Sequence, residues 1–331
     1  MRFITALVCI LFLLAFYSCD YKPKSQGEYS EVFVFADDEV RLASAPLMAN
    51  LLEIPIDTPQ PEQLFYLHWT DFENLNRIVN QRNIILMGTI DGGGEVSEYI
   101  RGMLDSKALE GVEQDDYWLF AKKNTWSREQ MLIILTAQDQ KTLAGKLIEN
   151  GGDIYRTLRN SVMQRLHDQL YYTAERKEIA EEITNEYGFK LRIPHDFSIT
   201  IDSPEERILR LRRCMPDRWL TIFWIDTDSL TEELLLNERI RAGKRFLDPV
   251  YIYPELNRFY PNDEIVPGGM ILRGMWATES SIGGGPFFTY AAHDSLSERI
   301  YFIDGAVFAP DREKVPLLLQ LEVMAQTFKL P

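Results

Sequence analysis

The spacing of apolar residues changes along the chain and divides it into two predicted domains. In the first part, apolar runs such as Glu31–Ala36, Asn83–Met87 and Met131–Leu135 alternate with stretches of helical period, which predicts alternating strands and helices. Five apolar residues then recur every four positions: Ile154, Leu158, Val162, Leu166 and Leu170. This spacing puts one apolar stripe on a long helix within 153–187, which ends at Gly188.

The second part predicts a regular succession of strands and helices. Four strands, a helix, three strands and a final helix follow in turn: 189–193, 197–201, 207–212, 219–225, 229–246, 270–278, 286–293, 299–309 and 312–328. Asp304-Gly305 in the last strand is interpreted as a bulge, and the Tyr- and Pro-rich segment 248–267 as a loop. The chain is therefore predicted to be α+β, with two α/β layered domains, 31–187 and 188–331, joined by the long helix. The second domain is predicted to be an α/β/α sandwich with a mainly antiparallel sheet.

Composition and charge narrow the class of protein. The 331 residues are 46% hydrophobic and 26% charged, as in soluble globular proteins, and the length is that of about two domains. The net charge of −15 gives the chain no electrostatic reason to bind nucleic acid. No nucleic-acid partner is therefore expected.

The N-terminus predicts an exported protein. Residues 1–18 consist of one arginine and an apolar run too short to span a bilayer, which is typical of a signal peptide. Ser18-Cys19 at its end resembles a bacterial lipobox, in which Cys19 carries the lipid, and 19–30 would then be a solvated, lipidated tether. We expect attachment to the outer membrane, facing the periplasm, because no acidic cluster follows Cys19. The alternative is an ordinary cleaved signal peptide with an incidental cysteine.

Few residues form a pattern with recognisable chemistry. The four histidines are isolated in sequence and the glycine runs 92–94 and 283–285 lack the spacing of a phosphate loop, so no metal, cofactor or catalytic set is predicted. A catalytic pair of carboxylates that are distant in sequence and meet only in the fold stays possible at this point. Arginines concentrate within 207–213, where they predict either a solvated face with acidic partners or an anion-binding face.

One candidate binding rim lies in the C-terminal domain. It comprises Arg273 and Trp276 on one strand and the turn and strand start Gly283, Gly284, Gly285 and Pro286. Glycines let a backbone approach a ligand closely, and an arginine offers two parallel donors to a carboxylate or phosphate. The alternative is that the glycines only turn the chain and that Arg273 points at solvent or a glutamate.

Several segments together resemble a known family. They are the lipobox, Asn83–Met87, Lys123-Asn-Thr-Trp126, the helix 153–187, Leu191-Arg-Ile-Pro194, Leu272-Arg-Gly-Met-Trp276, Gly284-Gly-Pro-Phe-Phe288 and Asp304-Gly305. They resemble a Bacteroidota lipoprotein family, domain of unknown function 4837, over nearly the whole mature chain. The family has no established activity, so the resemblance implies no catalytic residues. The order of elements in 189–328 also resembles the Mog1/PsbP-like sandwich, whose members mostly act as binding or assembly factors.

These features favour a binding protein over an enzyme. We expect an envelope lipoprotein, anchored to the membrane through Cys19, that acts as a binding or assembly module for a protein partner. A hydrolase of envelope material and a small-ligand carrier are the alternatives. A cleft with converging carboxylates or a Ser–His hydrogen bond would favour the hydrolase.

Overall fold

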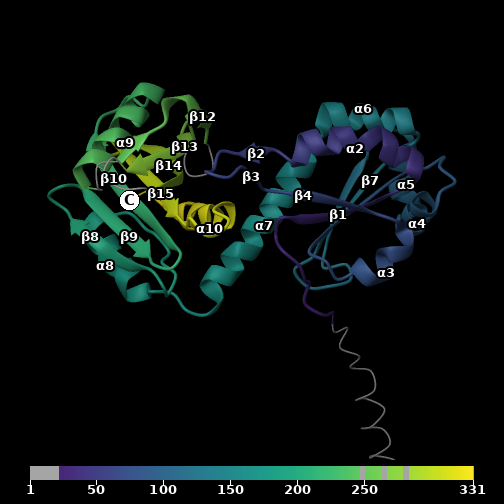
Figure 1. Ribbon diagram of the computed structural model, residues 1–331, viewed down its shortest axis with the longest axis horizontal. Coiled ribbons are helices and arrows are strands. Elements are labelled where there is room, and N and C mark those ends of the chain that lie inside the picture. Colours follow the sequence, from purple (N-terminus) through teal and green to yellow (C-terminus); the bar gives the residue numbers. More distant parts are fainter. Residues whose placement is uncertain (1–21, 247–249, 263–266, 279–282, 331) are drawn as a thin grey trace, which may run out of the picture. The chain divides into compact units, whose positions relative to one another are not determined.

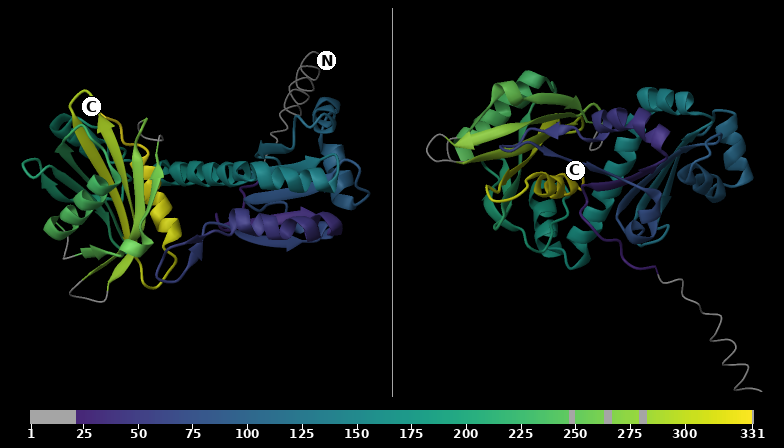
Figure 2. Two further views of the ribbon diagram at one scale, coloured as in Figure 1. Left: turned by 90° about the horizontal axis from the view of Figure 1, so that it is seen from above. Right: turned by 45° about the vertical axis from the view of Figure 1, so that its right-hand side comes forward.

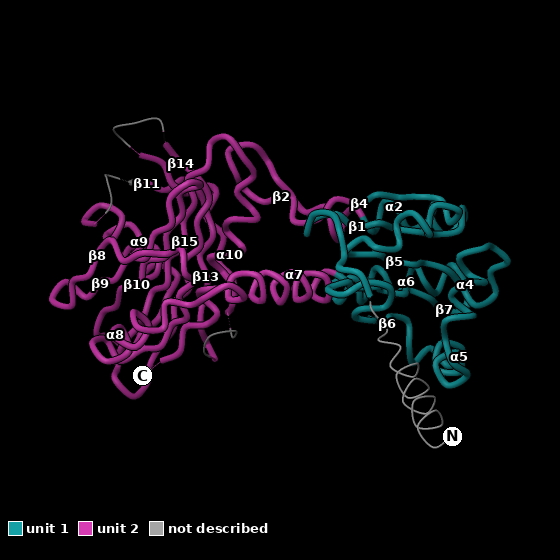
Figure 3. Tube along the Cα trace, turned by 90° about the horizontal axis from the view of Figure 1, so that it is seen from below, with its two compact units in different colours: residues 1–48, 67–154 teal, residues 49–66, 155–331 magenta. Residues whose placement is uncertain are grey.

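A computed structural model describes residues 22–246, 250–262, 267–278 and 283–330 (Figure 1). The chain forms two compact units, one of residues 1–48 and 67–154 and the other of residues 49–66 and 155–331 (Figure 3). The division therefore falls inside the long helix, and not at the predicted boundary between 187 and 188. The predicted signal peptide and Cys19 lie outside the described residues. Within those residues no helix is long and apolar enough to cross a membrane.

The first unit is built on a five-stranded sheet of order β4-β1-β5-β7-β6. The strands are β1 (Glu31–Ala36), β4 (Tyr66–Thr70), β5 (Asn83–Thr89), β6 (Leu119–Lys123) and β7 (Met131–Ala137). β1, β5 and β7 run parallel and β6 is antiparallel. Every residue of β5 and β7 is buried, as in parallel strands covered on both faces.

Helices cover both faces of this sheet. They are α2 (Asp38–Leu52), α3 (Leu75–Ile78), α4 (Glu95–Met103), α5 (Ser106–Glu113) and α6 (Gln140–Asn150), with a 3₁₀ turn at Phe72–Asn74. Figure 1 shows α2 and α6 on one side of the sheet and α3 and α4 on the other. Residues 24–27, predicted to be part of a solvated tether, instead form bridges to Gln81 and Arg128 because their backbone groups find partners there.

The second unit carries an antiparallel sheet of order β11-β13-β14-β15-β10-β9-β8, with β12 pairing to β13 as well. The strands are β8 (Ser198–Ser203), β9 (Ile208–Arg213), β10 (Asp217–Asp226), β11 (Val250–Ile252), β12 (Arg258–Pro261), β13 (Met270–Thr278), β14 (Gly284–Asp294) and β15 (Arg299–Phe308). β11, β12 and a 3₁₀ turn at Pro254–Leu256 lie in the segment expected to be a loop. Segment 189–193, expected to be a strand, forms only an isolated bridge there through Lys190.

Helices pack on both faces of this sheet as well. They are α8 (Lys177–Tyr187), α9 (Glu232–Phe246) and α10 (Val315–Ala325), and α7 (Gly152–Tyr172) contacts α10 through the Arg159–Glu322 ion pair. One core joins α8 and α10 to one face, and a second core joins α9 to the other. Figure 2 shows α9 (green) and α10 (yellow) on opposite sides of the strands. The mixed α and β content, the two sheet-bearing units and the mainly antiparallel C-terminal sheet confirm the predicted fold class.

The bulge expected at Asp304-Gly305 is absent from the described strand β15, which pairs without a break on both sides. Gly305 lies opposite Phe288, and a Cβ placed on it would stand 2.3 Å from the Phe288 ring. The glycine therefore makes room for an aromatic ring within a regular sheet.

Residues 53–66, here called the strap, pack on the second unit although they follow α2 of the first. The strap is a short hairpin of β2 (Pro55–Ile56) and β3 (Glu62–Gln63). Buried Glu62 accepts hydrogen bonds of 2.8 Å from the backbone N–H groups of Lys314 and Val315. A carboxylate at a helix N-terminus satisfies free donors and the helix dipole, so Glu62 anchors the strap at the start of α10.

Candidate functional site

The second unit contains a cavity of about 460 Å³ between the strap, α7, the strands β12–β14 and α10. A volume of this size is in the range of small-molecule sites. Its charged lining residues are Asp57, Arg159, Arg258, Arg273 and Glu322. Three tyrosines contribute to the lining, namely Tyr155, Tyr260 and Tyr290, and most of the remaining wall is apolar.

Glu322 is the buried carboxylate of this cavity. It lies on α10, a helix whose other residues are nearly all apolar, and only 2% of its side chain is exposed. Its Oε2 accepts a hydrogen bond of 2.7 Å from Arg159 Nη2, and its Oε1 one of 2.6 Å from Arg273 Nη1. The Tyr290 hydroxyl lies 3.4 Å from Oε2. Two guanidinium groups therefore share one carboxylate.

These contacts determine the protonation states of Glu322 and Arg273. Burial raises the pKa of Glu322, but the Arg273 and Arg159 guanidinium groups more than offset burial and hold the pKa below its usual value of 4.5. Burial lowers the pKa of Arg273, and the Glu322 carboxylate more than offsets that effect, so the pKa lies above its usual range. Both groups are charged at neutral pH.

Arg258 and Arg273 stand directly opposite each other on the antiparallel strands β12 and β13. Side chains at opposite positions of such a pair lie on the same face and about 5 Å apart at Cβ, where like charges are destabilising. Arg258 donates to the backbone carbonyls of Glu255 and Asn257, and no described carboxylate pairs with it. The Arg258–Arg273 pair therefore places two cations side by side at the cavity wall.

The six residues of the predicted rim do not form a single surface. Arg273 and Pro286 line the cavity, whereas Trp276 is 4% exposed and packs on Trp219 in the core on the opposite face of the sheet. Side chains alternate between faces along a strand, so positions 273 and 276 point in opposite directions.

The three rim glycines serve the packing of the sheet. A Cβ on Gly284 would meet the Trp276 carbonyl oxygen at 2.7 Å, and one on Gly285 would meet the Val307 carbonyl oxygen at 2.1 Å. The Gly283 carbonyl accepts the backbone N–H of Thr278, next to the first paired residues of β13 and β14. At Gly284 and Gly285 the backbone therefore closely approaches neighbouring strands of the same sheet, and the missing side chains make room for those strands.

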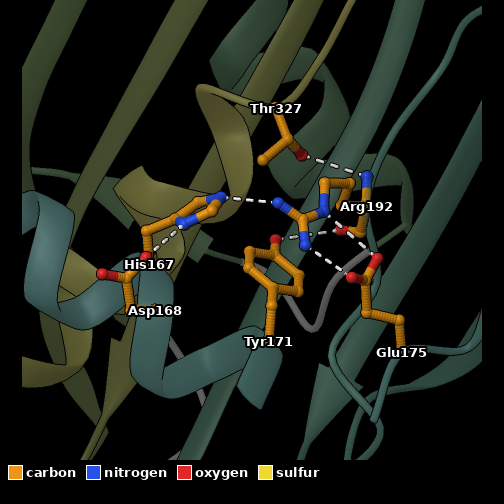
Figure 4. A network of polar contacts seen from close by, with 6 residues as sticks. All are labelled: His167, Asp168, Tyr171, Glu175, Arg192 and Thr327. Atoms are coloured by element: carbon orange, nitrogen blue, oxygen red, sulfur yellow. Dashed lines mark hydrogen bonds and ion pairs between the residues drawn. The ribbon is translucent and has the colours of Figure 1, made fainter. Parts of the chain in front are cut away.

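A second polar network surrounds Arg192 (Figure 4). Its guanidinium group pairs with both oxygens of Glu175, stacks 3.9 Å from the Tyr171 ring centre and lies 2.6 Å from His167 Nε2. The hydrogen bond from Arg192 lowers the pKa of Glu175, and burial raises the pKa of Tyr171 above its usual range. The Arg192 backbone N–H donates to Thr327. The network joins the segments around α7, Arg192 and the end of α10, and each group in it has a partner.

The arginine cluster of 207–213 is only in part the solvated face with acidic partners that the sequence predicts. Three of its members form ion pairs with nearby aspartates: Arg207 with Asp226, Arg212 with Asp217 and Arg213 with Asp196. Arg210 stacks 4.8 Å from the Trp219 ring centre. Ion pairs therefore neutralise Arg207, Arg212 and Arg213, whereas Arg210 has a ring and no described carboxylate as its partner.

Two other candidate sites, a metal site and the glycine run 92–94, are also accounted for among the described residues. Among the described residues no group of three or more His, Cys, Asp or Glu side chains could hold a metal ion. Beside the glycine run 92–94, the Asp37 carboxylate accepts the backbone N–H groups of Val96 and Ser97. A carboxylate of the chain thus takes the place at the start of α4 where a phosphate would bind.

Comparisons with known proteins identify two regions of unknown function. Residues 176–327 match the family described as Domain of unknown function (DUF4837), and residues 25–171 match Domain of unknown function (DUF8532). The DUF4837 match covers only the C-terminal one of these regions, whereas the resemblance was expected over nearly the whole mature chain; the two matches meet near the end of α7. No curated protein matches the chain. A solved structure of a Mog1 mutant is similar with 8% sequence identity and a TM-score of 0.30, over 43% of this chain and 90% of that chain.

The structure shows the alternative in which Arg273 points at a glutamate, but the sequence did not identify that glutamate or the two neighbouring arginines. Arg159 lies on the long helix, Glu322 in the final helix and Arg258 in a segment expected to be a loop. A lone glutamate within an apolar helix is the one sequence signal that points to a buried ion pair.

Proposed function

We propose that this protein is a lipid-anchored binding protein of the cell envelope whose C-terminal unit holds a ligand in the cavity between the strap, β13 and α10. The cavity supports this proposal, because it combines an apolar wall with a few converging charged groups. Its volume favours capture of a small ligand, or of one group of a larger partner, over docking of a flat protein surface.

The chemistry of Glu322 favours binding over hydrolysis. Both of its oxygens accept hydrogen bonds from arginines, and its pKa is lowered, so it stays ionised at neutral pH and cannot donate a proton as a general acid. The described cavity lining contains neither a serine nor a histidine, so it holds no Ser–His pair. The cavity therefore offers recognition groups and no evident acid–base pair.

Binding can be tested with a neutral apolar fluorophore, N-phenyl-1-naphthylamine, and the chain that begins at Asp20. We expect a fluorescence increase that saturates. Ile56→Trp, in the strap, should fill part of the cavity and abolish the increase. Ile148→Trp is the matched control, because Ile148 is 71% exposed on α6 in the first unit. An absent signal, or an equal signal in both variants, would refute the proposal.

The envelope location is supported by Ser18-Cys19 and by the resemblance to Bacteroidota lipoproteins. We place the protein on the outer membrane, facing the periplasm. Cys19→Ser should prevent lipidation and leave the chain as an unprocessed precursor or in the soluble fraction, whereas the exposed Cys214→Ser should remain membrane-attached. Membrane fractionation and gel mobility measure both. Unchanged attachment and mobility of Cys19→Ser would remove the lipoprotein assignment.

A further inference from the structure

The cavity wall carries more positive than negative charge. Its lining includes three arginines and two carboxylates, and both oxygens of Glu322 are already hydrogen-bonded to Arg159 and Arg273. The other carboxylate, Asp57, is exposed on the strap and forms no described ion pair with these arginines. Arg258 is exposed and 32% of the Arg273 side chain is exposed, so an anion from solvent can reach this excess of positive charge and compensate it.

The excess positive charge lies at one place in the cavity wall, at Arg258 and Arg273. Arg258 and Arg273 face each other across β12 and β13, and Arg258 has only backbone carbonyls as described hydrogen-bond partners. Arg273 uses Nη1 for Glu322 and makes no other described side-chain hydrogen bond. A guanidinium group has five N–H donors, so each of the two arginines keeps donors for a shared partner.

We propose that the cavity takes its ligand through an anionic group, a carboxylate or a phosphate, that sits between Arg258 and Arg273. This inference rests on the ligand-binding function proposed above and names the ligand's chemical class. An anion there would compensate the opposed like charges and accept hydrogen bonds from both guanidinium groups. Glu322 acts as a positioning residue, because its carboxylate accepts a hydrogen bond from Arg273 Nη1 and so fixes the orientation of that side chain.

The rest of the ligand should be apolar. The cavity wall next to the arginines is formed by aliphatic and tyrosine side chains, among them Ile54, Leu256, Tyr260 and Leu319. Tyr260 lies two positions after Arg258 and therefore on the same face of β12. A molecule with one anionic end and an aromatic or aliphatic body fits both parts of the wall.

Four probes with the same body and different ends test this inference. They are 4-phenylbutyrate, 4-phenylbutyl phosphate, 4-phenylbutanol and 4-phenylbutylamine, titrated into the chain from Asp20 by isothermal calorimetry. At least one anion should bind about tenfold more tightly than the alcohol, since one charge-assisted hydrogen bond contributes about that factor, and the amine should bind most weakly. The order of the two anions shows whether a carboxylate or a phosphate is preferred.

Variants of Arg258 locate the effect. Arg258→Gln should reduce the advantage of the anion over the alcohol about tenfold, and Arg258→Lys should keep part of it. The control Arg241→Gln should retain the full advantage, because Arg241 is similarly exposed and lies on α9, on the other face of the sheet. Circular dichroism checks that each variant is folded.

The outcomes separate this inference from the proposed function. Equal binding of anion and alcohol, no binding of any probe, or an advantage that survives in Arg258→Gln would each overturn the anion assignment. Fluorophore binding that Ile56→Trp abolishes would still support a ligand cavity in those cases.

Discussion

The shared carboxylate of Glu322 provides a direct test of how the cavity is held together. Glu322→Gln keeps the shape of the side chain and removes its charge. Arg159 and Arg273 then lose the carboxylate that compensates them. Breaking a buried ion pair in this way typically costs about 3–5 kcal/mol. We expect the lower end of that range, because 32% of the Arg273 side chain is exposed and is partly solvated.

The loss can be measured by differential scanning calorimetry. For a unit of 150–250 residues, 1 kcal/mol corresponds to about 2–4 °C in Tm, so Glu322→Gln should lower the Tm of the second unit by about 6 °C or more. Asp311→Asn is the matched control, because its pair with Arg312 is largely exposed, and its Tm should be unchanged. Added phosphate should stabilise Glu322→Gln more than the wild type, since the variant leaves the arginines without a counterion.

The pH dependence gives a second, independent criterion. The folded-state pKa of Glu322 lies below its usual value of 4.5, so its contribution to stability is fully present above about pH 4.5 and is lost as the pH falls through the folded-state pKa. The difference in Tm between wild type and Glu322→Gln should therefore shrink in acid. A loss below 1 kcal/mol at pH 7, or a difference that stays constant down to pH 2, would refute the reasoning.

Three further substitutions test local structure by urea unfolding. Glu62→Ala removes the acceptor of two N–H groups at the start of α10 and should cost about 1–2 kcal/mol; an unchanged midpoint would show that the strap is not anchored there. Asp37→Ala removes the carboxylate at the start of α4 and should cost a similar amount; no loss would show that water replaces it. Gly305→Ala forces a Cβ against the Phe288 ring and should cost about 1–3 kcal/mol, whereas Gly145→Ala, with open space around its Cβ, should be neutral or stabilising.

The fold class could be predicted because it depends on local periodicity. The apolar run Asn83–Met87 is strand-like in composition and length, and the structure extends it only to Thr89. The four-residue repeat of the long helix likewise survives as the buried face of α7. The domain division could not be predicted in the same way, because the strap joins the second unit through the contacts of Glu62 with a helix some 250 residues later.

The site was only partly predictable for a related reason. Arg273 can be identified from its own strand, but side chains alternate along that strand, and three positions later Trp276 points to the other face. Arg258 lies in a four-residue strand whose Tyr- and Pro-rich neighbours are typical of loops. Its importance appears only from the register of β12 against β13.

A high density of arginines in the sequence is a poor guide to where this protein binds an anion. The arginines of 207–213 are close in the chain; nearby aspartates such as Asp196 and Asp217 pair with three of the four, and the fourth, Arg210, lies against the Trp219 ring. Arg258 and Arg273 are fifteen positions apart, and the antiparallel pairing of β12 with β13 makes them neighbours. Only Arg273 has a described hydrogen bond to a buried carboxylate, that of Glu322. What attracts an anion is the positive charge that the fold leaves uncompensated, and that quantity depends on strand register and burial. The cavity arginines, and not the arginine-rich strand, are therefore where a ligand anion should bind.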